Sequence, residues 1–294
     1  MIIDSHVHFW DPARGDDILI VRRESAMHQR FYPQDLRPQL EAAGVDRCVV
    51  IQSAPQVAET RHLLDLVQGL DWIHGVVGWV DLERDDIADT LAELRAAGPL
   101  AGVRVMLHRQ ADDNWIARAA VGRGLRTLAA AGMSLDLITE PRHLGAVRQA
   151  LVAVPELRAI INHGATPPIA SGAFEPWAGD SALLARDTQA WCKFSGLREV
   201  AGPDPDDERI LPYARYILAA FGPRRLLYAS NWPVCDLAGG HARWWESAHA
   251  ILDRLGVSST DQDAIFGGNA RAAYQTSPHL ESKRPRTDQA GSTT

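Results

Sequence analysis

The sequence lacks paired cysteines and long apolar runs. Its three cysteines, Cys48, Cys192 and Cys235, are widely spaced and form no Cys-x-x-Cys pair, which is typical of a reduced intracellular protein. No apolar run approaches the ~18 residues of a membrane span, and the N-terminus has no basic region followed by a long apolar stretch. We therefore expect a cytoplasmic protein with no signal peptide and no membrane partner.

An excess of positive charge is also absent, as are the common nucleotide and nucleophile motifs. The formal net charge of the 294 residues is −7 and the pI is near 5.9. This balance argues against nucleic acid or an anionic membrane surface as the main partner. The sequence contains no Gly-x-Ser-x-Gly, no P-loop and no Gly-rich dinucleotide fingerprint. With 46% apolar and 23% charged residues, the composition is that of an ordinary globular enzyme.

Short apolar runs alternate with helix-like stretches along most of the chain. Near-continuous apolar strands separated by helices predict a parallel sheet covered on its outer face. Eight such units in about 270 residues favour a (β/α)8 TIM barrel of the α/β class, with a doubly wound open sheet as the alternative. We expect one catalytic domain over residues 1–276 and a disordered C-terminal tail over 277–294, where the composition becomes polar. The predicted strands cover residues 2–6, 47–52, 74–80, 102–107, 135–138, 158–163, 191–195 and 225–230.

Two histidines close the first predicted strand. His6 and His8 are two residues apart, so in an extended chain both imidazoles point to the same side. Such a pair can hold a metal ion, or bind and protonate an oxygen atom of a substrate. A bare His-x-His also arises by chance, with one structural and one surface histidine. Its place at the mouth of the predicted barrel favours a functional pair.

Polar side chains recur at nearly every other strand end, where a barrel faces its substrate. For several of them, a structural role is the alternative to a role in the site. Arg104 and Asp136 could form an ion pair inside the barrel, Lys193 could pair with a carboxylate, and His108 could lie exposed on a loop. The candidates from these strand ends are Gln52, Arg104, His108, Asp136, His163, Lys193, Asn231 and Trp232.

Several segments together resemble the amidohydrolase superfamily, specifically the amidohydrolase-2 branch of sugar-lactone and pyrone-dicarboxylate lactonases. The segments follow the order of that family over roughly residues 1–276. They include Asp4-Ser5-His6-Val7-His8-Phe9-Trp10-Asp11-Pro12, Gly102-Val103-Arg104, Asn162-His163, Cys192-Lys193-Phe194-Ser195-Gly196-Leu197 and Ser230-Asn231-Trp232-Pro233-Val234-Cys235. The resemblance implies a (β/α)8 hydrolase that opens the lactone ring of a small sugar acid, such as a fucono-, rhamnono- or galactonolactone.

The resemblance also implies roles for individual residues. His6, His8, His163 and Asn231 match the catalytic positions, which in the wider superfamily hold one or two divalent ions. One metal ion, Zn²⁺, is therefore the expected cofactor, although the lactonase branch often dispenses with it. We expect the substrate to be bound by Arg104, Lys193, His108, Trp10, Trp232 and Gln52.

Asn231 departs from the family pattern, which has aspartate at this position. Aspartate can take a proton from water and return it to the leaving alkoxide, whereas asparagine cannot act as a base and is a weak, uncharged metal ligand. Either the base lies elsewhere, or the chain is catalytically impaired, or the substitution was engineered. The rival functions are a metal-dependent decarboxylase, hydratase or isomerase of small acids on the same fold, and a non-catalytic binding protein. The sequence leaves open whether the chain forms a homo-oligomer.

Overall fold

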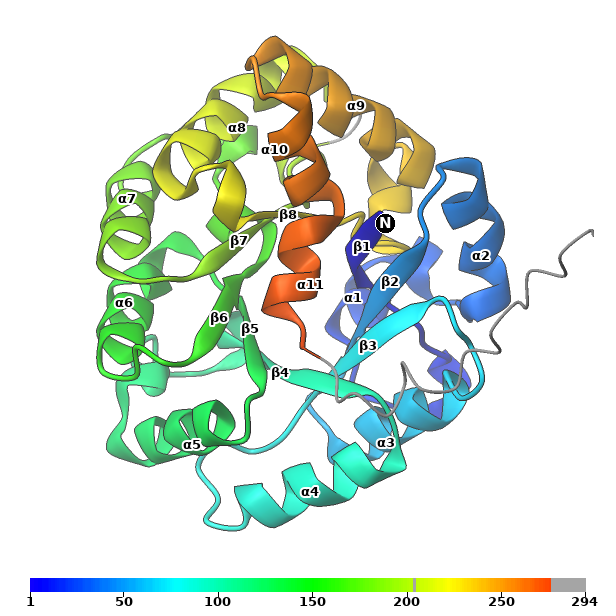
Figure 1. The fold of residues 1–294 in the computed structure, drawn as a ribbon, viewed down its shortest axis with the longest axis vertical. Helices are drawn as coiled ribbons and strands as arrows, with labels where there is room; N and C mark the ends of the chain where they lie inside the picture. Colours follow the sequence, from blue (N-terminus) through cyan, green and yellow to red (C-terminus); the bar gives the residue numbers. More distant parts are fainter. Residues whose placement is uncertain (203–204, 276–294) are drawn as a thin grey trace, which may run out of the picture.

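The chain folds into a barrel of parallel strands. The computed structural model describes residues 1–202 and 205–275. Each strand pairs with the next along the chain, and the ring closes where Asn231 N donates to His6 O at 2.9 Å and His8 N donates to Trp232 O at 2.8 Å. The predicted (β/α)8 barrel is confirmed (Figure 1). The strands are β1 (Ile3–Val7), β2 (Arg47–Ile51), β3 (Ile73–Gly78), β4 (Leu100–Met106), β5 (Ser134–Ile138), β6 (Arg158–Ile161), β7 (Trp191–Phe194) and β8 (Leu226–Tyr228).

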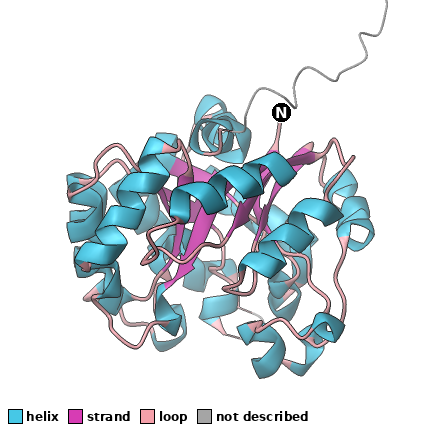
Figure 2. Ribbon diagram, turned by 90° about the horizontal axis from the view of Figure 1, so that it is seen from below, coloured by secondary structure: helices cyan, strands magenta, loops and turns pink. Residues whose placement is uncertain are grey.

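Helices surround the barrel and cover the outward faces of the strands (Figures 1 and 2). In α5 (Ala119–Ala130), for example, Val121, Leu125 and Leu128 are buried at helical spacing, so that this helix has one apolar side. The surrounding helices are α2 (Pro33–Ala42), α3 (Val57–Leu66), α4 (Ile87–Ala97), α5 (Ala119–Ala130), α6 (Leu144–Val152), α7 (Trp177–Asp187), α8 (Asp207–Phe221) and α9 (Gly240–Arg254). No helix of the described residues is long and apolar enough to cross a membrane.

The C-terminal segment closes the barrel at the N-terminal ends of the strands. It consists of α10 (Ser259–Asp263), a five-residue π-helical turn (Ala264–Gly268) and α11 (Asn269–Ala273), which cross that end in Figure 1. A Cβ atom at Gly267 would lie 2.0 Å from the Met1 carbonyl oxygen, so glycine permits this close packing. Tyr274 follows and is fully buried. The tail predicted over residues 277–294 lies outside the described residues.

The long connection between β1 and α2 lies at the opposite end of the barrel. It contains α1 (Leu19–Arg23) and two short 3₁₀ turns, Pro12–Arg14 and Ser25–Met27. Arg109 ties this connection to the residues after β4, since its guanidinium donates to the backbone carbonyl of Asp17 at 2.9 Å and also contacts the Asp17 carboxylate. The connection is thereby held over the mouth where the strands end.

Candidate active site

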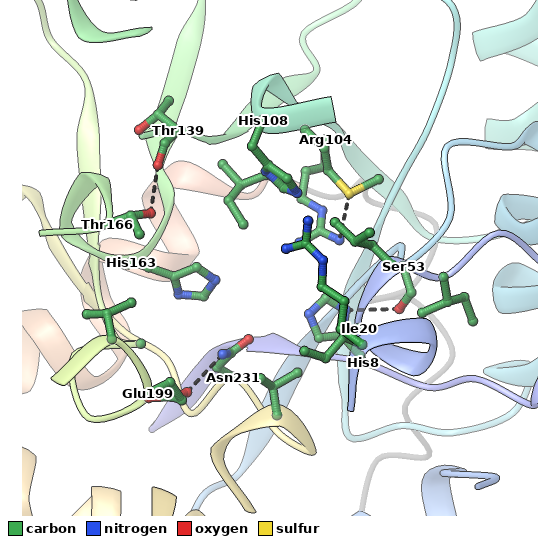
Figure 3. A pocket seen from close by; sticks show the side chains of 18 of the residues that line it. His8, Ile20, Ser53, Arg104, His108, Thr139, His163, Thr166, Glu199 and Asn231 are labelled. Carbon is green, nitrogen blue, oxygen red and sulfur yellow. Dashed lines mark hydrogen bonds between the residues drawn. The ribbon is translucent and has the colours of Figure 1, made fainter. Parts of the chain in front are cut away.

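A pocket of about 340 Å³ opens at the C-terminal ends of the strands. His8, His163 and Asn231 face it from one side, and Arg104 and His108 reach it from β4 and the turn that follows (Figure 3). Much of the remaining wall is apolar. That wall is formed by Trp10, Ile18, Leu19, Ile20, Met106, Ile138, Val200 and Val234.

His6 and His8 form a directly bonded pair in which the partners define the position of each proton. Lys193 Nζ lies 3.0 Å from His6 Nδ1, and an ammonium can only donate, so His6 carries its own proton on Nε2. His8 Nδ1 donates to Ile51 O at 2.8 Å, which leaves His8 Nε2 as an acceptor. The two Nε2 atoms are 3.0 Å apart, and His6 therefore donates to His8. Its Nε2–H group is thus directed at His8, which lines the pocket.

The ammonium that contacts His6 belongs to a buried ion pair between Lys193 and Asp136. Lys193 and Asp136 are both fully buried, with Lys193 Nζ 2.5 Å from Asp136 Oδ1. Asp136 also accepts from Asn162 Nδ2 at 2.8 Å and from the hydroxyl of Tyr274 at 2.8 Å. Burial lowers the pKa of Lys193 to about 8, against the opposing effect of Asp136. Lys193 is the only lysine among the first 282 residues.

His163 occupies a backbone conformation that few residues adopt. Its φ is 53°, in the left-handed region that is costly for a residue with a Cβ atom. Ser195 Oγ holds its Nδ1 at 2.7 Å. Gly196 packs against the ring, and a Cβ atom there would lie 2.8 Å from three atoms of the His163 side chain. The ring centroids of His163 and His6 are 4.7 Å apart, so these interactions position His163 beside the histidine pair.

All three imidazoles are held neutral. Burial, reinforced by Lys193, lowers the pKa of His163 to about 3. Burial and the Lys193 ammonium hold the pKa of His6 well below its usual range, and burial and the Arg104 guanidinium do the same for His8. The site therefore presents neutral hydrogen-bonding nitrogens near pH 7.

Asn231 and Glu199 form a second bonded pair at the mouth. Asn231 follows β8 with φ at 64°, a left-handed conformation that asparagine and aspartate tolerate better than most residues. Its Nδ2 donates to Glu199 Oε1 at 2.8 Å, and both side chains line the pocket (Figure 3). Burial raises the pKa of Glu199, while the bond from Asn231 opposes that rise.

Arg104 contributes a positive charge to the pocket, and His108 contributes a neutral imidazole. One terminal nitrogen of Arg104 donates to the backbone oxygen of Gln52, while its Nε is buried without a hydrogen-bond partner. Burial, together with the Arg104, Arg23 and Arg109 guanidinium groups, lowers the pKa of His108 to about 4.

The structure brings most of the predicted site residues together. His8, His163, Asn231, Arg104, His108 and Trp10 line the pocket, and His6 lies directly beside His8 and His163. Asp136 pairs with Lys193 instead of forming the alternative ion pair with Arg104.

Three of the residues predicted to bind substrate do not line the pocket. Lys193 is buried below His6 and does not line the pocket, because it points into the barrel one layer beneath the strand ends. Gln52 is also buried below the pocket, where its Nε2 donates to Arg104 O at 3.3 Å. Trp232 packs against Phe9 and Phe31 with 1% of its surface exposed.

Sequence reasoning missed Glu199, Tyr274 and the apolar residues of the β1–α2 connection. Glu199 follows β7 in an irregular segment, and Tyr274 approaches the site from the far end of the barrel. The sequence did contain one indication of Glu199. Asn231 is an amide at the position of the expected base, which indicates that another carboxylate is required in the site.

Comparison with known proteins agrees with this geometry. The model of the Amidohydrolase family matches residues 3–276. The chain belongs to the amidohydrolase family. It is 38% identical over 276 residues to an L-fucono-1,5-lactonase of Burkholderia ambifaria, covering 93% of this chain and 95% of that protein. It is 27% identical over 142 residues to an L-rhamnono-gamma-lactonase of Scheffersomyces stipitis, covering 41% of each. Among solved structures, an amidohydrolase of Burkholderia multivorans with bound zinc superimposes with a TM-score of 0.89 at 28% identity, covering 94% of this chain and 100% of that one.

Members of this family typically bind a divalent metal, but the donor set of this amidohydrolase does not fit one. His6 bears its proton on Nε2, the atom that faces His8, because Lys193 occupies Nδ1. Asn231 contributes an uncharged amide in place of a carboxylate. Within residues 1–202 and 205–275, no group of three or more His, Cys, Asp or Glu side chains is arranged to hold a metal ion.

Proposed function

We propose that this amidohydrolase opens the lactone ring of a small sugar acid by attack of water on the ring carbonyl. The observation that carries the proposal is that His8, His163 and Asn231 line one pocket with Arg104 and His108, while the buried His6 ring contacts those of His8 and His163. The similarity to lactonases along nearly the whole chain supports the same reaction.

His6 is suited to stabilise the charge that develops on the carbonyl oxygen. Its Nε2–H is fixed as a donor by Lys193, and a preorganised donor in a buried site stabilises an oxyanion without reorganisation. Before the substrate binds, His8 Nε2 accepts the hydrogen bond that His6 Nε2–H donates. A bound carbonyl oxygen would replace His8 as the acceptor.

Pocket size and lining favour a compact ring with one apolar side. The volume of about 340 Å³ is at the lower end of small-molecule sites. Arg104 and His108 would bind hydroxyl groups or the product carboxylate, while the wall formed by Ile18, Ile20 and Val234 would cover carbon atoms. A five- or six-membered aldonolactone, such as a fucono-, rhamnono- or galactonolactone, meets these requirements.

We also infer that hydrolysis does not require a metal ion. The support is the donor set, in which a protonated His6 Nε2 and a neutral amide replace metal ligands. In this arrangement the imidazoles act as hydrogen-bonding groups.

The proposal is tested by a panel of 1,4- and 1,5-aldonolactones, with a pyrone dicarboxylate and aromatic carboxylic acids as rival substrates. Ring opening releases a proton and is followed with a pH indicator, whereas decarboxylation is followed by absorbance. We expect turnover of at least one aldonolactone, and a loss of at least about 100-fold in kcat/KM for His163→Gln. Turnover of only the aromatic acids, or of no lactone, would contradict the proposal.

A further inference from the structure

The proposed lactone hydrolysis needs a base that Asn231 cannot supply. Water attacks an ester carbonyl efficiently when a positioned group accepts its proton. The imidazoles that line the pocket, those of His8, His108 and His163, are weak proton acceptors, because burial and neighbouring cations lower their pKa values. Carboxylates are the remaining candidates, and in the described part of the chain the pocket is lined by two of them, Glu140 and Glu199.

Glu140 is poorly suited to this role. Arg142 NH1 lies 2.7 Å from its Oε2, and its side chain is 39% exposed. A carboxylate paired with a guanidinium and open to solvent is a weak proton acceptor. Glu140 also belongs to the turn after β5, which reaches the pocket rim.

Glu199 lies in direct contact with Asn231 at the pocket. Its Oε1 accepts a hydrogen bond of 2.8 Å from Asn231 Nδ2, so the two side-chain ends are in direct contact beside His163 and His8 (Figure 3). A neutral amide donor orients this carboxylate without neutralising it. An aspartate at 231 would instead place two negative charges in contact, which is strongly unfavourable. Asparagine at 231 is therefore the residue that a functional carboxylate at 199 requires.

We propose that Glu199 is the general base of this lactonase and that Asn231 positions it. A bond forms between the water oxygen and the carbonyl carbon while Glu199 takes one proton from that water. When the tetrahedral intermediate collapses, the bond between this carbon and the ring oxygen breaks, and its electron pair goes to the ring oxygen. Glu199 returns the proton to that oxygen. The products are a hydroxyl group and a carboxylic acid, which loses its own proton to solvent.

The test compares wild type with Glu199→Gln on the best lactone of the panel. Glutamine keeps the size of the side chain and an oxygen that accepts from Asn231 Nδ2, so it preserves positioning and removes only the base. We expect kcat to fall about 100-fold or more, KM to stay within about threefold, and the acidic limb of the kcat/KM profile to disappear. Glu93→Gln is the matched control, because this exposed carboxylate on α4 pairs with Arg61 away from the pocket, and it should keep kcat within about threefold.

A second variant separates a base from a structural carboxylate. In Asn231→Asp/Glu199→Gln the carboxylate moves to residue 231, and the glutamine amide can donate to it. We expect the kcat of this double variant to be at least tenfold higher than that of Glu199→Gln. If Glu199→Gln keeps the wild-type kcat and acidic limb, or if the exchange recovers nothing while circular dichroism shows a folded chain, the inference is overturned. If the wild-type protein hydrolyses none of the lactones, the proposed function itself is overturned, and this outcome is measured without any variant.

Discussion

Replacing Lys193 by methionine tests the buried network beneath the site. The ammonium is fully buried, 2.5 Å from Asp136 Oδ1 and 3.0 Å from His6 Nδ1. Methionine retains the apolar stem but leaves the Asp136 carboxylate with only the neutral donors Asn162 and Tyr274. Breaking a buried pair in this way costs about 3 to 5 kcal/mol of unfolding free energy. We also expect kcat to fall at least about tenfold, because His6 Nδ1 loses the donor that keeps the proton on Nε2.

Urea denaturation and initial rates of lactone hydrolysis measure the two effects separately. The control is Lys193→Met/Asp136→Asn, which removes the uncompensated charge. It should regain most of the lost stability, since a buried pair replaced as a whole costs little, yet remain slow because no ammonium contacts His6. A single variant within about 1 kcal/mol of wild type, or a double variant with the wild-type kcat, would refute the reasoning.

Three further outcomes are expected. Gly196→Ala forces a Cβ atom to 2.8 Å from the His163 side chain at a φ of 69°, so kcat/KM should fall at least tenfold in steady-state assays; an unchanged value contradicts the packing argument. Arg109→Ala releases Asp17 and the connection over the pocket, and should raise KM several-fold with little change in kcat. Because the protonated form of Lys193 donates to His6 and its pKa is lowered to about 8, kcat/KM should decline as pH rises through about 8; a flat profile from pH 7 to 9.5, after correction for spontaneous hydrolysis, would be inconsistent with this role.

The barrel could be predicted from the sequence because its strands are buried on both faces. In β2, Cys48–Ile51 is a fully buried apolar run, which is typical of a covered parallel sheet, and the predicted ends lie within a few residues of the observed ones. The C-terminal helix was less predictable. Residues 261–275 have a helical pattern, but a π-helical turn interrupts them where Gly267 packs on Met1, and this contact depends on the tertiary fold.

The sequence predicts those site residues that follow directly from the ends of strands. It does not predict how deep a side chain lies in the barrel, or where an irregular segment places its residues. His6 and His8 could be placed from strand alternation, and His163 from its position at the end of a predicted strand. Lys193 also follows this alternation, but its depth below the mouth turns it from a substrate ligand into a support for His6. Glu199 belongs to an irregular segment whose path depends on packing, so only the folded chain brings it to Asn231.

The most direct test of the central claim is the kcat/KM of chelator-treated, metal-free wild type on the best aldonolactone of the panel. The account predicts a value of at least about 10⁴ M⁻¹ s⁻¹, within the usual enzymatic range, and no increase beyond about twofold on adding Zn²⁺. Hydrolysis that is undetectable above the spontaneous rate, or that appears only when Zn²⁺ is added, would contradict it.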